Sequence, residues 1–155
     1  MTQQTFNGDL QIIETKDGGD CVLQDGIFNA DHGFGTAFYL SLFGGNKADS
    51  GKVKNRNTWW GNTLGGIQEN EKNVSRFQNF ICSKPMTVKN IKDAETMAQL
   101  DLKWAIDEKI ADAINVSIRS ENVNKIRLFI SALKDGKEVH KAEYGVSWEA
   151  MLNGV

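Results

Sequence analysis

Hydrophobic and polar residues alternate along the C-terminal third of the chain. The apolar positions of this alternation are Ile114, Val116, Ile118, Ile126, Leu128, Ile130 and Ala132. A period of two residues is typical of strands that bury one face. Asn122-Val123-Asn124 and Asp135-Gly136 are hairpin-turn signals, and Val139–Val146 follows the second of them. The pattern therefore predicts three antiparallel strands joined by two tight turns.

Earlier in the chain the apolar residues recur at helical spacing. A run from about His32 to Phe43 is apolar on most sides, which is typical of a helix that is buried on most sides. Asp31 is the expected N-cap of this helix. Gly44-Gly45 are expected to end it, because glycine readily adopts the left-handed C-cap conformation.

Two further helices are expected before the strands. The first is short, from Val74 to Cys82, and Pro85 ends it. The second is the longest of the chain. It begins at a cap on Thr87 or Asn90 and runs to about Ile110. Helices followed by a run of strands indicate an α+β domain, in which two to three helices pack on a small, mainly antiparallel C-terminal sheet.

The rest of the chain is expected to form an arm and a loop within one domain of 155 residues. Residues 1–30 are interpreted as an N-terminal arm of short strands, over Asp9–Thr15 and Cys21–Leu23, with a turn over Lys16–Asp20. Residues 45–70 are interpreted as a long polar loop. Loops of this length are often functional or are ordered by a partner.

Trp59 and Trp60 stand side by side on this loop. Two large rings need cover, either from the core of this chain or from a partner, and tryptophan is enriched among interface hot spots. Adjacent residues of an extended loop point in opposite directions. We therefore expect one ring to face inward and the other to face a partner.

Composition limits the classes of function. The chain is 40% hydrophobic and 25% charged with a net charge of −2, which is ordinary for a globular protein and gives no indication of a nucleic-acid partner. No apolar run approaches the ~20 residues of a transmembrane helix, and the polar start is unlike a signal peptide. Cys21 and Cys82 lie far apart, which fits a reducing compartment. We expect synthesis in the cytoplasm and no membrane association.

Four carboxylates near the end of the long helix are candidates for catalytic groups. They are Asp101, Asp107, Glu108 and Asp112. A glycosidase needs two carboxyl groups about 5 to 9 Å apart across a cleft. These lie instead on or just beyond a helix whose other face, including Leu100 and Ile106, is apolar. With Lys103 and Lys109 between them, they are interpreted as a solvated face with weak ion pairs.

The two histidines do not form a metal-binding pattern. His32 is expected at a helix start and His140 at an exposed strand position, with no second ligand at metal-binding spacing. We therefore assign no catalytic residues, no metal ligands, no cofactor and no small-molecule substrate.

Several segments, taken in order, resemble a known family. They are Gly35–Phe43, Trp59-Trp60-Gly61-Asn62, Ser75-Arg76-Phe77, Leu102–Asp107 and Ala111–Val116, and the match extends from about Gly8 to Trp148. The chain resembles the small baseplate proteins of Mu-like contractile-tail phages. These are relatives of a baseplate wedge subunit that is sometimes labelled lysozyme-like. Ala111-Asp112-Ala113 replaces the Glu-Pro-Arg segment that the wider family often shows, so contacts tied to that segment are not transferred.

The resemblance implies a structural subunit of the tail baseplate in the virion, not an enzyme. It also implies synthesis in the cytoplasm of a bacterial host. Its implied partners are other wedge and hub proteins and the tail sheath protein, and its implied role is to join wedge to hub and to template the first sheath ring. The expected mechanism is strand addition at an exposed edge of the C-terminal sheet. A tail-associated peptidoglycan hydrolase and an unrelated soluble protein-binding module remain as alternatives.

Two sets of residues are candidates for this pairing. One is the outer face of the second strand, with Arg127, Phe129 and Ser131. The other is the last strand, with Lys141, Glu143 and Gly145. Arg76 is a third candidate contact, since its guanidinium can hold a carboxylate either of this chain or of a partner.

Overall fold

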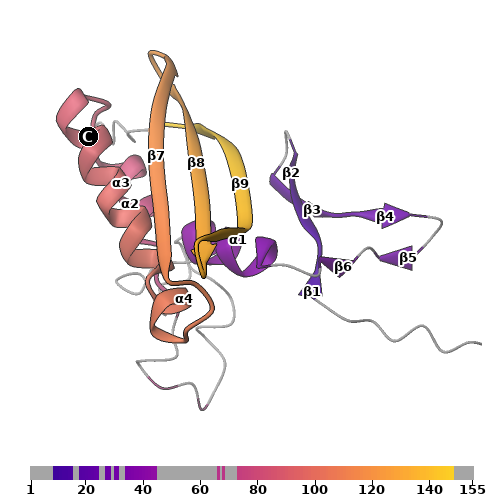
Figure 1. Ribbon diagram of the computed structural model, residues 1–155. Coiled ribbons are helices and arrows are strands. Elements are labelled where there is room, and N and C mark those ends of the chain that lie inside the picture. The colour runs from indigo at the N-terminus through magenta and orange to yellow at the C-terminus, as the bar shows by residue number, and fades with distance from the viewer. Residues whose placement is uncertain are drawn as a thin grey trace, which may run out of the picture.

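A computed structural model describes residues 9–15, 18–24, 27–28, 30–31, 34–44, 66, 68 and 73–148. In this part of the chain, helices pack on one face of a C-terminal antiparallel sheet, and short strands form a separate arm (Figure 1). The predicted α+β class is therefore confirmed.

The sheet has the strand order β7 (Ala113–Asn122), β8 (Lys125–Lys134) and β9 (Lys137–Ser147). The predicted Asp135-Gly136 turn is confirmed. Both residues have positive φ, 50° and 71°, as a two-residue turn of the type favoured in hairpins requires. At the other turn, Asn122 Oδ1 accepts a hydrogen bond from Asn124 N at 3.0 Å.

One face of the sheet is apolar and the other is polar, as the alternation predicts. Ile118, Ile126, Leu128, Ile130 and Ala132 are buried against the helices. The intervening residues point to the opposite face, which is partly or fully exposed. The sheet therefore buries one side only.

The helices are α1 (Gly35–Phe43), α2 (Arg76–Ser83), α3 (Val88–Leu102) and α4 (Trp104–Asp107). In Figure 1, α2 and α3 lie beside β7 and α1 lies towards β9. Ala94 and Ala98 are fully buried on α3, where their small side chains allow close packing. Phe38 of α1 is also fully buried, and its ring centroid lies 4.9 Å from that of His140 on β9.

Trp148 closes the core at the end of β9. Its indole Nε1 donates to Lys84 O at 2.6 Å, and its backbone N donates to Asn124 O at 2.7 Å. Through its side chain and its backbone, Trp148 thus links the residue after α2 to the turn between β7 and β8. Ser147, the residue before Trp148, is the last residue of β9.

The expected start of the first helix is wrong. Asp31 does not cap it, because Ala30–Asp31 form strand β6, and α1 begins only at Gly35. Gly44 ends the helix as expected, but with a right-handed φ of −82°. Glycine is needed there for space, since a Cβ would lie 2.4 Å from Leu40 O.

The long helix begins as predicted but ends early. Thr87 is its N-cap and accepts a hydrogen bond from Asn90 N at 3.2 Å, which confirms one of the two expected caps. The helix ends at Leu102 instead of continuing to Ile110. A tight turn at Lys103 leads into the single turn of α4.

The arm consists of paired short strands. The strands are β1 (Asp9–Leu10), β2 (Ile12–Thr15), β3 (Gly18–Cys21), β4 (Leu23–Gln24), β5 (Ile27–Phe28) and β6 (Ala30–Asp31). They pair β1 with β6, β2 with β3 and β4 with β5. The predicted Lys16–Asp20 turn is wrong over Gly18–Asp20, which belong to β3. Figure 1 shows the arm extending from α1 on the β9 side, and Thr36 Oγ1 donates to Leu10 O at its base.

Candidate interaction surfaces

The two edges of the sheet differ. β7 lies along α3, and Glu95 Oε1 of α3 accepts a hydrogen bond from Ile118 N at 2.8 Å. This contact occupies an outward backbone donor of β7. Among the described residues, no strand and no helix side chain bonds in this way to the outer backbone of β9.

The register identifies which residues of β9 present their backbone outward. Because Ile118 N points to Glu95, its partner Leu128 directs its N–H and C=O groups towards β9, where it is paired with Tyr144. Backbone groups alternate in direction along a strand. The outward groups of β9 are therefore those of Lys141, Glu143 and Gly145, which we call the β9 edge.

The two predicted sets of pairing residues lie on different kinds of strand, one central and one at the edge of the sheet. Arg127, Phe129 and Ser131 lie on the outer face of the sheet, but β8 is its central strand and pairs on both sides. The proposal that they pair with a partner backbone is therefore wrong. Lys141 and Glu143 lie on the last strand and are exposed.

The outer face carries a network of charges centred on Arg127. Its Nη1 lies 2.6 Å from Glu143 Oε1, and its Nε lies 2.5 Å from Glu121 Oε1. The hydrogen bond to Glu143 is the largest cause of the raised pKa of Arg127. Arg119 lies over the ring of Phe129, with 5.1 Å between its Cζ and the ring centroid. Of the residues of the β9 edge, Glu143 takes part in this network.

Arg76 holds a carboxylate of its own chain. Its Nη1 lies 3.0 Å from Asp101 Oδ1, and Asp101 Oδ2 accepts a hydrogen bond from Phe77 N at 2.8 Å. Asp101, on α3, thus satisfies a backbone donor in the first turn of α2. Its side chain is fully buried, so the expectation that Asp101 belongs to a solvated face is wrong.

Asp101 has one property of a catalytic acid. Burial raises its pKa to about 6, while the hydrogen bonds from the backbone of Phe77 and from Arg76 act in the opposite direction. A general acid must also reach its substrate. The Asp101 side chain has no exposed surface and is bonded to α2, so its position indicates a structural role.

Of the other candidate carboxylates, Asp107 and Asp112 form ion pairs at the surface, and Glu108 is exposed. Asp107 pairs with Lys103 at 2.5 Å, as expected for a solvated helix face. Asp112 pairs with Lys134 at 2.8 Å, and its Oδ2 accepts from Asp135 N at 2.8 Å. The Lys134 hydrogen bond lowers the pKa of Asp112. Asp112 therefore supports the turn between β8 and β9.

His140 was expected to be exposed, and this is wrong. Its ring lies edge-on to that of Phe38, on the inner face of β9. The described residues contain no group of three or more histidine, cysteine, aspartate or glutamate side chains arranged to hold a metal ion. No helix in the described ranges is both long enough and apolar enough to cross a bilayer.

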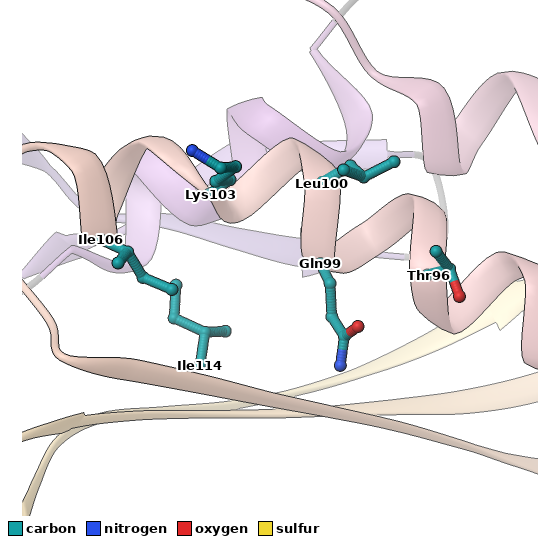
Figure 2. Close-up of a pocket in the computed structure, with 6 residues that line it drawn as sticks. All are labelled: Thr96, Gln99, Leu100, Lys103, Ile106 and Ile114. Atoms are coloured by element: carbon teal, nitrogen blue, oxygen red, sulfur yellow. The ribbon is translucent and has the colours of Figure 1, made fainter.

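A shallow groove of about 370 Å³ lies between α3, α4 and the start of β7 (Figure 2). Its lining residues are Thr96, Gln99, Leu100, Lys103, Ile106 and Ile114. Leu100 and Ile106 are 45% and 39% exposed, although helical spacing placed both on the buried face. Leu100 lies within α3, on the side of the helix away from the buried Ala94 and Ala98. Ile106 follows the tight turn at Lys103, which interrupts the helical repeat and which helical periodicity alone does not predict.

Trp59 and Trp60, and with them most of the predicted 45–70 loop, lie outside the described residues. Comparisons of this chain with protein-family models, with curated proteins and with solved structures found no match.

Proposed function

We propose that this protein is a non-enzymatic structural subunit of a contractile phage tail baseplate. In this proposal it joins wedge and hub proteins within the virion. It also templates the first ring of sheath protein by accepting an extended partner segment along the β9 edge. The single observation that carries the proposal is the outer backbone of β9, to which no described residue pairs, beside a charged sheet face. The sequence resemblance supplies the identity of the partners.

Strand addition at this edge provides both affinity and register. The outward N–H and C=O groups of Lys141, Glu143 and Gly145 supply the backbone hydrogen bonds. Alternate side chains of the added strand meet Lys141 and Glu143 on the outer face. The remaining ones extend the apolar inner face beside Tyr144 and Val146, which pack against the core.

The test replaces a backbone donor without changing the strand ladder. Proline at Glu143 removes an outward N–H, and proline is tolerated on edge strands. The matched control, Glu143→Ala, removes the same side chain but keeps the donor. Each variant is co-expressed with the sheath and wedge proteins encoded beside it, and the complexes are purified through a tag on this chain.

We expect wild type and Glu143→Ala to retain the partner, and Glu143→Pro to lose it by about tenfold or more. Circular dichroism should show the same thermal unfolding for Glu143→Pro and Glu143→Ala. Retention of the partner by a folded Glu143→Pro variant contradicts strand addition at this edge. A wild-type protein that binds neither sheath nor wedge protein contradicts the baseplate proposal and favours an unrelated binding module.

The raised pKa of Asp101 is the observation that keeps a hydrolase as the second candidate. A turbidity assay on peptidoglycan separates the two functions. Lysis by wild type that Asp101→Asn abolishes would replace the structural proposal with a hydrolase. We expect no lysis, because the carboxyl group is buried and bonded to α2.

A further inference from the structure

We infer that two copies of this protein pair with each other, antiparallel along the β9 edge, about a two-fold axis at Ala142. This self-association is a separate claim from partner binding, although both use the same outward backbone groups of β9. Among the described residues, the short strands β1 to β6 pair only with one another and leave this edge available.

The register follows from the direction of the backbone groups. Lys141 and Glu143 both direct their N–H and C=O groups outward, so in an antiparallel pair each can exchange two hydrogen bonds with the other. Placing Lys141 opposite the second copy's Glu143 puts Ala142 opposite its own counterpart. The symmetry then repeats the first contact, as an isologous interface requires.

This register brings opposite charges together twice. Lys141 of each copy lies directly across from the second copy's Glu143 on the outer face, a position where opposite charges stabilise a sheet. Arg127 holds the Glu143 carboxylate on that face, 2.6 Å from its Nη1. A register shifted by two residues loses this match, since it places Lys141 opposite either another lysine or Gly145.

On the inner face of the sheet, the same register also brings together side chains that are compatible with pairing. His140 lies opposite the second copy's Tyr144, and both belong to the inner face that packs on α1. At the axis the two Ala142 side chains are small. A β-bulge at Val139, between the pairs Ala132–His140 and Leu133–Glu138, ends the regular stretch on one side. The pairing therefore spans about five residues of each copy, which makes the dimer weak and reversible.

The test uses charge reversal and mixing. Lys141→Glu places Glu opposite Glu in a homodimer, and Glu143→Lys places Lys opposite Lys. A mixture of the two variants restores opposite charges at both contacts. Lys89→Glu is the matched control, since Lys89 is an exposed lysine on α3, away from the β9 edge. Sedimentation equilibrium between about 10 and about 500 µM protein measures the dimer dissociation constant.

We expect wild type and Lys89→Glu to dimerise equally. Each β9 variant alone should dimerise about tenfold more weakly, and their equimolar mixture should recover wild-type affinity. A wild type that stays monomeric over the whole range overturns the inference, as does a mixture no tighter than its components. Neither result affects the co-purification test, which reports the baseplate proposal independently.

Discussion

At the scale of the residue, Asp101 shows how one side chain joins two helices. It belongs to α3, yet its carboxylate accepts the backbone N–H of Phe77 and pairs with Arg76 at the start of α2. An aspartate is a common cap for its own helix. Here the cap comes from a neighbouring helix, so the contact also fixes the packing of α2 on α3.

Burial of this carboxyl group makes stability depend on pH. The pKa of Asp101 is raised from 3.8 to about 6 in the folded state, so between these values the folded chain binds a proton that the unfolded chain does not. The resulting stabilisation is fully present below about pH 4 and is lost as the pH rises through about 6. We expect the difference in unfolding free energy between wild type and Asp101→Asn to grow in favour of wild type from pH 7.5 to pH 4.5.

Urea denaturation of both proteins across this range measures that difference, and other titrating groups contribute equally to both. A difference that is constant with pH, or that shrinks on acidification, contradicts the raised pKa.

At the scale of the element, Gly44 sets where α1 ends. A Cβ at this position would lie 2.4 Å from Leu40 O and 2.7 Å from Asn73 Nδ2. The backbone carbonyl has little freedom to move, so we expect Gly44→Ala to cost about 1 to 3 kcal/mol in unfolding free energy. Gly145→Ala is the control, because a Cβ there meets nothing within 4 Å.

We expect the control to change stability by less than about 0.5 kcal/mol. Equal effects of the two alanines in chemical denaturation show that space at Gly44 is not limiting.

Local patterns predicted the elements, and contacts between distant segments decided where the predictions were wrong. The strand alternation, the Asp135-Gly136 turn and the Thr87 cap depend on residues close in sequence, and all three are confirmed. Asp101 is buried by a segment 24 residues earlier, and His140 by the ring of Phe38. No pattern in the sequence near these two residues contains that information.

The candidate interaction residues show the same contrast between what local patterns predict and what contacts between distant segments decide. The last strand was predicted because Val139–Val146 follows the Asp135-Gly136 turn, but the choice of β9 over β7 depends on Glu95 reaching Ile118 from α3. Arg76 was predicted to hold a carboxylate, whereas the identity of its partner required the packing of α2 on α3.

At the scale of the whole molecule, hydrogen bonds join the residues on either side of the segment 45–72. Asn73 Nδ2 donates to Leu40 O at 2.8 Å, and Ser75 Oγ donates to Ser41 O at 3.0 Å. The chain therefore returns to α1 close to where it left. We expect replacement of residues 46–71 by about six glycine and serine residues to leave the rest of the chain folded. The free energy of unfolding should rise by roughly 1 kcal/mol, because closing a shorter loop costs less conformational entropy.

Thermal unfolding followed by circular dichroism, together with one-dimensional proton spectra of the core methyl groups, measures the outcome. A variant that fails to fold shows that the excised residues, Trp59 and Trp60 among them, complete the core.

The hydrogen bond from Ile118 to Glu95 has a consequence for solubility. Amyloid-like fibrils grow because every sheet within them offers a template on both of its sides. Here α3 obstructs one side, so each molecule can contribute a single template. Association through this sheet is therefore expected to stop at closed, finite complexes. The protein can expose a strand edge that pairs with other strands, even at high local concentration, without polymerising.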